Sequence, residues 1–197
     1  MPTKAAYLLA IPGFADWEPA HALAELRRAG GYRVEIAASS RAPVESMGGV
    51  SVLPSRALPD VDPDDVAIFI LPGGDRWEDT PPEPALVTLL ETLDDAQVPI
   101  AAICGATVGV ARAGLLRNRR HTSNGLAYLQ AQVRGYRDAA NYVDRPAVRD
   151  RHLITASGLA DVEFAAEIFA ELGVFSEADR ALWVQYFRGG RLPAGAA

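Results

Sequence analysis

The stretch Pro99-Ile-Ala-Ala-Ile-Cys-Gly-Ala-Thr-Val-Gly-Val-Ala-Arg-Ala-Gly114 decides how this chain folds. Its apolar first part indicates a buried β-strand over residues 98–103, and a helical pattern follows at once over residues 105–116. A strand that passes directly into a helix holds the residue between them at a tight turn. The sequence therefore predicts a nucleophile elbow with Cys104 at its tip, where Gly105 and Ala106 leave room beside the thiol.

Outward from this stretch, short apolar runs alternate with longer helical patterns, which is typical of an α/β protein with a parallel sheet. The further expected strands cover residues 5–11, 32–39 and 66–71. The further expected helices cover residues 16–29, 83–94, 161–172 and 176–187, and hairpins are expected within 43–54 and 147–155. Because short connections favour neighbouring right-handed crossovers, the strands ending at Ile11, Leu71 and Ile103 should lie side by side.

The composition is that of one globular domain. The chain has 197 residues, of which 49% are hydrophobic and 22% are charged. This balance has neither a long apolar run nor the low hydrophobicity of disordered chains. We expect one domain over residues 1–188 and a flexible tail over residues 189–197, which are rich in Gly, Ala and Pro.

The charge and the cysteine content limit the partners and the compartment. Nineteen basic and 25 acidic residues give a net charge of −6, which repels nucleic acid unless a local basic patch overcomes it. We interpret the basic cluster of Arg117, Arg119 and Arg120 as cations near a helix C-terminus. A single cysteine cannot form an internal disulfide, and no signal peptide is evident. The sequence thus predicts a cytoplasmic protein that binds neither nucleic acid nor a membrane.

Three loops should meet Cys104 at the carboxyl edge of the sheet, where open α/β sheets bind ligands. The turn Pro72-Gly73-Gly74 follows the strand over 66–71, so the amides of Gly74 and Gly105 could both point at a developing oxyanion. The first loop brings Glu18, which is expected in the first turn of a helix capped by Asp16. A carboxylate there often only complements the helix dipole, but a desolvated glutamate can stay protonated and donate to a thiolate. The helix N-terminus should also lower the thiol pKa from about 8.5.

These motifs resemble those of the ThiJ/PfpI superfamily, which shares a flavodoxin-like core with class I glutamine amidotransferases. Ala15-Asp-Trp-Glu-Pro-Ala20 resembles the loop that carries the family glutamate, Ile70-Leu-Pro-Gly-Gly-Asp75 the glycine turn, and residues 101–116 the elbow with its helix. The resemblance spans nearly the whole chain. It implies a flavodoxin-like three-layer α/β sandwich with a mainly parallel sheet.

The resemblance also implies roles for individual residues. Cys104 would be the nucleophile and Glu18 its carboxyl partner, with Gly74 and Gly105 as oxyanion donors. Homodimers are usual in the superfamily, and the helix opening at Asp16 and the hairpin near residues 48–49 are the candidate contacts.

The histidines are where the chain departs from the family patterns. The protease-like branch has a histidine directly after the cysteine, where this chain has Gly105. The deglycase-like branch places its histidine at the position of Asn124, which can orient a carbonyl but cannot act as a base. His121 lies three residues earlier, and it would reach Cys104 only if a strand there ended or bulged before Asn124. His152 lacks the downstream Glu of the amidotransferase His-x-Glu pattern.

Three functions therefore stay open. The leading hypothesis is a cysteine-dependent hydrolase or amidase acting on a small carbonyl or amide compound. The alternatives are a protein that senses oxidation through Cys104 without turnover, and a glyoxalase or deglycase acting on reactive dicarbonyls. We expect no cofactor and no metal, because the acidic loop over residues 60–65 matches no calcium-binding spacing.

Overall fold

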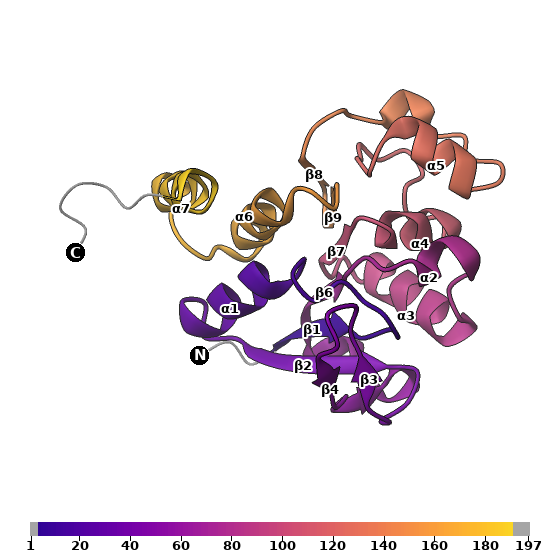
Figure 1. The fold of residues 1–197 in the computed structure, drawn as a ribbon, viewed down its shortest axis with the longest axis horizontal. Coiled ribbons are helices and arrows are strands. Elements are labelled where there is room, and N and C mark those ends of the chain that lie inside the picture. The colour runs from indigo at the N-terminus through magenta and orange to yellow at the C-terminus, as the bar shows by residue number, and fades with distance from the viewer. Residues whose placement is uncertain (1–3, 191–197) are drawn as a thin grey trace.

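The structure is a computed structural model that describes residues 4–190. Its centre is a seven-stranded sheet with the strand order β5-β2-β1-β6-β7-β9-β8 (Figure 1). All neighbouring strands are parallel except β8 and β9, which form an antiparallel hairpin. The sheet strands are β1 (Ala5–Leu9), β2 (Arg33–Ala38), β5 (Arg56–Ala57), β6 (Val66–Leu71), β7 (Ile100–Ile103), β8 (Ala147–Asp150) and β9 (Leu153–Ala156).

Helices cover both faces of the sheet, so the molecule has three layers (Figure 1). One face carries α1 (Ala20–Arg28), α6 (Asp161–Leu172) and α7 (Glu177–Gly189). The other carries α2 (Arg76–Asp79), α3 (Pro84–Asp95), α4 (Ala106–Arg112) and α5 (Leu126–Gln132). The remaining elements are the hairpin of β3 (Val44–Glu45) and β4 (Ser51–Val52) and the short turns η1 (Leu58–Asp60), η2 (Pro63–Asp65) and η3 (Ala139–Asn141).

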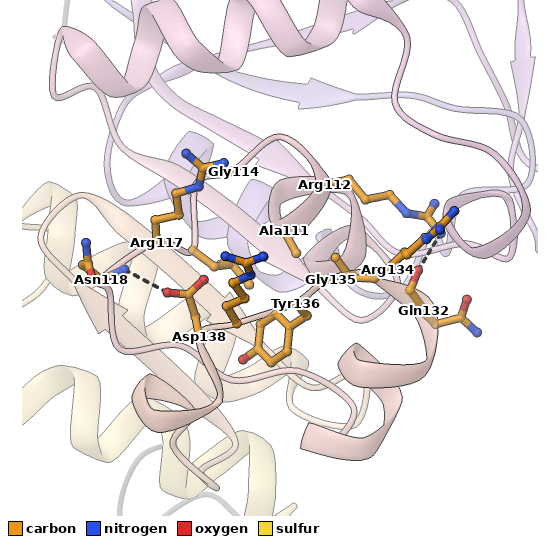
Figure 2. A pocket seen from close by; sticks show the side chains of 13 residues that line it. Ala111, Arg112, Gly114, Arg117, Asn118, Gln132, Arg134, Gly135, Tyr136 and Asp138 are labelled. Carbon is orange, nitrogen blue, oxygen red and sulfur yellow. Dashed lines mark hydrogen bonds between the residues drawn. The ribbon is translucent and has the colours of Figure 1, made fainter.

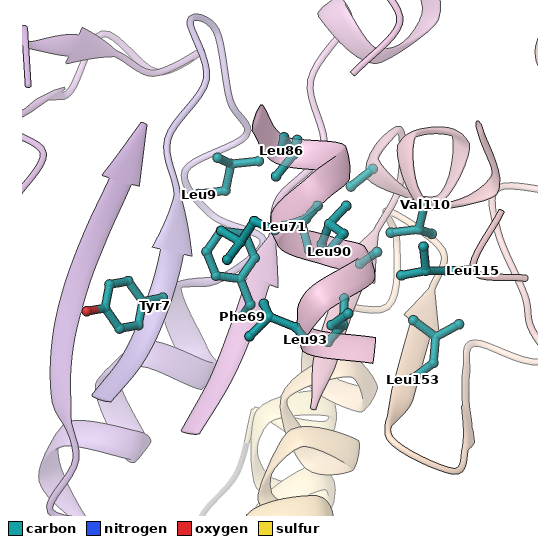
Figure 3. Close-up of a cluster of buried hydrophobic side chains, with 14 of the residues drawn as sticks. Tyr7, Leu9, Phe69, Leu71, Leu86, Leu90, Leu93, Val110, Leu115 and Leu153 are labelled. Carbon is teal, nitrogen blue, oxygen red and sulfur yellow. The ribbon is translucent and has the colours of Figure 1, made fainter. Parts of the chain in front are cut away.

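The period-two pattern of the central strands builds one hydrophobic core on each face. Phe69 and Leu71 of β6 point to the side of α3 and α4, where they pack with Leu90 (Figure 3). Ile68 and Ile70 of the same strand point to the opposite core, formed with α1 and α6. Both sets are fully buried, which explains why β6 is a continuous apolar run rather than an alternating one.

The predicted fold class and strand neighbours are confirmed. The strands β1, β6 and β7 lie side by side, so their carboxyl ends deliver three loops to one edge of the sheet. Both expected hairpins are present. This edge is where Cys104 lies, between β7 and α4.

The start of the first helix differs from the prediction. Helix α1 begins at Ala20 with Pro19 as its N-cap residue, and Asp16 does not cap it. Instead the Asp16 carboxylate accepts a hydrogen bond from the Ser46 hydroxyl at 2.6 Å. The Asp16 side chain, which the local pattern predicts as a helix cap, thus bonds to a residue 30 positions away in the chain. As a consequence, Glu18 lies in the turn before α1 and not in its first turn.

Two further boundaries differ from the prediction. Helix α4 ends at Arg112 rather than at residue 116, because Gly114 adopts a left-handed backbone with φ +83° that no helix continues through. Helix α7 extends to Gly189, where Gly190 caps it, and residues 191–197 of the expected tail lie outside the described residues. Within residues 4–190, none of the helices is both long enough and apolar enough to span a bilayer.

Candidate active site

Cys104 occupies a strained turn that the surrounding backbone holds in place. Its φ is +57°, a left-handed conformation that costs a non-glycine residue about 1–2 kcal/mol. The Cys104 amide donates to the carbonyl of Ala156 at 2.9 Å, at the end of the neighbouring strand β9. Its carbonyl accepts the amide of Thr107 at 3.1 Å and the Thr107 hydroxyl at 2.6 Å. The elbow is thus fixed on both sides while its thiol remains half-exposed.

Glu18 lies directly against this thiol. Its side chain is 1% exposed and forms a hydrogen bond with Cys104. Its Oε2 accepts the amide of Gly73 at 2.5 Å, which fixes the carboxyl group against the glycine turn after β6. A Cβ atom at Gly73 would lie 2.7 Å from both the Cys104 Cβ and the Glu18 Oε2. Only a glycine at position 73 lets the three loops come this close.

Asn124 completes the polar contacts of the sulfur. Its Oδ1 accepts the amide of Gly158 at 2.9 Å, so its Nδ2 faces Cys104 and donates to the Sγ at 3.3 Å. A Cβ atom at Gly158 would lie 2.8 Å from the same Sγ. The loop after β9 therefore packs onto the thiol and also orients the amide that binds it. Sequence reasoning missed Gly158, although it lies two residues after β9, the strand that pairs with β7.

The electrostatics of the pair differ from the expected thiolate. Burial raises the pKa of the Cys104 thiol to about 11, and the negative charge of Glu18 adds to this effect. The N–H groups of Asn124 and Gly105 oppose the rise without cancelling it. Burial also raises the pKa of Glu18, helped by the charge of Asp161 and opposed by hydrogen bonds from Gly73 and Cys104. With a pKa of about 11 the thiol stays protonated at neutral pH, and its titration depends on the charge of Glu18 beside it.

The two predicted oxyanion donors are brought together. A Cβ atom at Gly105 would lie 2.9 Å from the Gly74 carbonyl oxygen, so the turns after β6 and β7 are in contact. Gly74 has φ +149°, a conformation open to glycine. Neither amide donates to a backbone carbonyl within residues 4–190, whereas the Gly73 amide is occupied by Glu18. Their role as oxyanion donors stays a prediction.

The structure does not bring a histidine to the thiol. His121 is fully buried, and its ring is held by the Arg119 carbonyl at 2.7 Å and the Tyr136 hydroxyl at 2.5 Å. The segment contains no strand from His121 to Asn124, only one isolated bridge from His121 to Tyr142. Burial lowers the His121 pKa. Asn124 and His121 thus lie in different surroundings, and only Asn124 contacts Cys104.

The other two histidines are also engaged elsewhere. His152 bonds to Asp94 at 2.7 Å at the amino end of β9, which is the edge of the sheet opposite to Cys104. His21 lies 3.4 Å from Asp161 and packs on the rings of Trp183 and Phe187. Glu18 is therefore the titratable side chain that contacts the thiol within the described part of the chain. The same residues hold no cluster of three or more His, Cys, Asp or Glu side chains suited to a metal.

An open cavity of about 390 Å³ is lined by Asn124, although not by Cys104 or Glu18. It includes the exposed side chains of Arg145 and Leu159, and Arg145 forms no side-chain hydrogen bond or ion pair within residues 4–190. The other residues that line it are Ser123, Gly125, Tyr142, Asp144, Pro146, Ser157, Ala160 and Arg188. This space can hold a small molecule beside Asn124, the residue whose amide donates to the Cys104 sulfur.

The sequence pattern of the DJ-1/PfpI family matches residues 3–171. This chain belongs to the DJ-1/PfpI family. It is 36% identical to YoaZ of Bacillus subtilis, named an uncharacterized protease, over 93% of this chain and 90% of YoaZ. The deglycase TK1284 of Thermococcus kodakarensis is 28% identical, over 59% of this chain and 69% of the deglycase.

A solved structure agrees with this membership. The crystal structure of a DJ-1 superfamily protein from Agrobacterium tumefaciens superposes with a TM-score of 0.85 at 34% identity, over 95% of this chain and 100% of that one. The elbow, the glutamate loop and the glycine turn predicted membership of this family. The match over residues 3–171 confirms that prediction.

Proposed function

We propose that this DJ-1/PfpI protein is a cysteine-dependent enzyme that acts on a small carbonyl or amide compound. The observation that carries the proposal is the half-exposed Cys104 thiol on a strained elbow, in contact with the buried Glu18 and the Asn124 amide. Strained, over-determined turns with perturbed pKa values are typical of catalytic sites. The 390 Å³ cavity beside Asn124 is of a size that suits a small-molecule substrate.

The chemistry begins with proton transfer within the pair. Because its pKa is raised, the Glu18 carboxylate is a stronger base than an ordinary glutamate, and it can take the thiol proton as Cys104 attacks. The new carbon–sulfur bond places negative charge on the substrate oxygen. The amides of Gly74 and Gly105, neither of which donates to a backbone carbonyl within residues 4–190, are the groups available to stabilise that oxygen.

For an amide substrate, the protonated Glu18 would return its proton to the leaving nitrogen as the carbon–nitrogen bond breaks. This step leaves a thioester on Cys104. Water would then attack the thioester carbon and give its proton to Glu18, which releases the acid and restores the thiol. One carboxyl group serves as acid and base in turn, so no imidazole is required. YoaZ, named an uncharacterized protease, supports amide hydrolysis.

A second candidate is dicarbonyl chemistry of the glyoxalase or deglycase type. The missing histidine favours it, since thiol addition to an aldehyde carbon expels no leaving group and so needs only Glu18 to move the proton to oxygen. Glu18 could then shift a proton between the two substrate carbons to give a thioester, which water would hydrolyse to a hydroxy acid. The relative named deglycase TK1284 supports this candidate.

Intact-mass spectrometry after acid quench tests the proposal. The protein would be incubated with methylglyoxal, with a panel of small primary amides and with mild peroxide, and product release would be followed in parallel. The Cys104→Ser and Glu18→Gln variants separate nucleophile from proton transfer. Glu91→Gln, at an exposed position of α3, serves as the matched carboxyl control.

We expect a substrate-derived mass on Cys104 together with product formation that both active-site variants lose and the control keeps. Product from methylglyoxal alone would select the dicarbonyl reaction, and product from amides alone would select the hydrolase. A Cys104 that gains oxygen from peroxide but turns over no substrate would contradict the proposal and favour an oxidation-sensing protein.

A further inference from the structure

A cavity of about 870 Å³ lies away from the elbow, beside the end of α4 and the chain that follows α5 (Figure 2). Its lining is rich in arginine and contains a single carboxylate, that of Asp138. The residues that form it are Ala111, Arg112, Gly114, Leu116, Arg117, Asn118, Gln132, Val133, Arg134, Gly135, Tyr136, Arg137 and Asp138. We call this cavity the arginine cleft. Cys104, Glu18 and Asn124 do not line it.

Three of its arginines have no counter-ion. Arg117, Arg134 and Arg137 are exposed, and none of their side chains forms a hydrogen bond or an ion pair within residues 4–190. The Arg117 Nε lies 3.7 Å from where a Cβ of Gly114 would be, so its guanidinium rests on bare backbone at the cleft wall (Figure 2). Three unpaired guanidinium groups face one hollow from two segments of the chain.

Arg112, the fourth arginine of the cleft, differs from these three because its guanidinium bonds to backbone carbonyls. Its guanidinium donates to the carbonyls of Trp77, Glu78, Thr80 and Gln132 at 2.6–3.2 Å. These bonds tie α2 and the end of α5 to α4, and they make one wall of the arginine cleft rigid. No carboxylate within the described residues neutralises this fourth positive charge.

The charge of the arginine cleft opposes that of the chain. The protein has a net charge of −6, yet the cleft combines four arginines with one aspartate. One oxygen of Asp138 already accepts the amide of Asn118 at 3.2 Å. A cationic hollow in an acidic protein concentrates anions locally, because low-dielectric walls focus its field.

Arg117 and Arg119, which lie close together in the sequence, have different surroundings in the structure. Arg119 is buried and pairs with Asp94, whereas Arg117 opens into the arginine cleft. Neither lies in the last turn of α4, which ends at Arg112 and whose final carbonyls bond to backbone amides. The interpretation of this cluster as helix-terminal cations is therefore wrong for Arg117 and Arg119.

We propose that the arginine cleft binds an organic diphosphate, a small molecule with two linked phosphoryl groups such as a nucleoside diphosphate. Planar guanidinium forks match phosphoryl oxygens in a bidentate way. Arg117 follows α4, whereas Arg134 and Arg137 follow α5, so guanidinium groups line the cleft from two segments of the chain. This spread suits a ligand with two linked phosphoryl groups better than a ligand with one. The volume lies in the upper part of the range of about 300–1,000 Å³ for small-molecule sites, which leaves room for an organic group.

Isothermal titration calorimetry of the full chain tests this site with ADP, inorganic pyrophosphate and adenosine as probes. The test variants are Arg117→Gln and the double variant Arg134→Gln/Arg137→Gln, which remove exposed charges and should leave the melting temperature unchanged. Arg120→Gln removes the same charge three residues from Arg117 but outside the arginine cleft. Protein alkylated at Cys104 separates binding in the cleft from binding at the elbow.

We expect ADP and pyrophosphate to bind, with an affinity that falls as salt rises and with no measurable binding of adenosine. Each test variant should weaken binding about tenfold or more, as expected for a lost charge-assisted hydrogen bond, while Arg120→Gln and the alkylated protein bind as before. Three results would overturn the proposal: equal binding by the test variants, loss of binding on alkylation, or tight binding of single-stranded nucleic acid but not of ADP.

Discussion

Cys104 and Glu18 form one titrating unit rather than two independent residues. The thiol gains no net acidity from the helix that follows it, because burial and the glutamate charge outweigh the N–H groups of Asn124 and Gly105. Glu18 is held on the other side by the Gly73 amide. In the proposed mechanism, reactivity at neutral pH depends on a proton that moves from sulfur to carboxylate, and not on a free thiolate.

Gly158→Ala should damage the site by crowding alone. The new Cβ would lie 2.8 Å from the Cys104 Sγ and 3.0 Å from its Cβ, closer than such atoms approach in proteins. We expect a loss of about 1–3 kcal/mol in stability and slower alkylation of the thiol, measured by thermal unfolding and iodoacetamide kinetics. Gly189→Ala adds the same group where nothing lies within 4 Å and should change neither value. An unaltered Gly158→Ala would contradict the described packing.

Asn124→Ala should make the thiol a weaker acid. The Asn124 amide lowers the Cys104 pKa by donating to the sulfur, so its removal should raise that pKa further, by about one unit. Alkylation at a fixed pH below 11 should then slow about tenfold. Asn141→Ala, remote from the thiol, is the control. A faster reaction in Asn124→Ala would mean that the amide only shields the sulfur.

At the scale of elements, an ionic cluster on the opposite edge of the sheet joins α3, β9 and the chain after α4. Asp94 accepts two hydrogen bonds from Arg119, at 2.5 and 2.9 Å, and one from His152 at 2.7 Å. Burial alone would raise the Asp94 pKa, but these partners lower it overall. The cluster is structural, and it accounts for two residues that the sequence left without a partner.

Asp94→Asn should weaken this cluster in a pH-dependent way. A carboxyl group with a lowered folded pKa stabilises the fold above its unfolded pKa of about 3.9, and the contribution is lost as the pH falls through the folded value. The variant should lose about 1–2 kcal/mol at neutral pH in urea unfolding, and the difference from wild type should shrink near pH 3. Asp95→Asn, on the exposed neighbouring residue, should behave as wild type. A deficit that persists in acid would refute the assignment.

At the scale of the whole molecule, four of the seven large apolar side chains exposed within the described residues belong to the loop before α1 and the β3–β4 hairpin region. Trp17 is 49% exposed, and Met47, Val50 and Leu53 of the β3–β4 hairpin region are 46%, 54% and 70% exposed. The hairpin is joined to the loop before α1 by the bond between Ser46 and Asp16. We propose that this surface is the two-fold contact of a homodimer, as the family resemblance implies.

Sedimentation equilibrium checks this contact directly. The wild type should sediment as a dimer at micromolar concentration, and the Val50→Asp/Leu53→Asp variant should sediment as a monomer, because each charge would be buried on both sides of the axis. Leu182→Asp changes an exposed leucine on α7 and should leave the dimer intact. A wild type that sediments only as a monomer, or a dimer that survives both aspartates, contradicts the proposal.

Sequence reasoning predicted the features that depend on residues close together in the chain. The apolar run before Cys104 and the glycine after it predict the elbow, and the uninterrupted apolar β6 predicts a central strand. The parts it missed depend on distant partners. Asp16 accepts a hydrogen bond from Ser46 instead of capping the helix, and Gly158 packs on the sulfur of a residue 54 positions earlier in the chain. The arginine cleft forms between the end of α4 and the chain after α5, which are separate in the sequence.

The most direct test of the coupled Cys104–Glu18 unit is the pH dependence of iodoacetamide alkylation, which is unambiguous because Cys104 is the only thiol in the chain. The wild-type rate should rise through an apparent pKa of about 11. Glu18→Gln removes the negative charge and supplies an N–H donor to the sulfur, so it should lower that pKa by about one unit or more, whereas Glu91→Gln should not. An unchanged profile in Glu18→Gln, or a wild-type thiol that reacts only after unfolding, would contradict the coupling and leave Cys104 a structural cysteine.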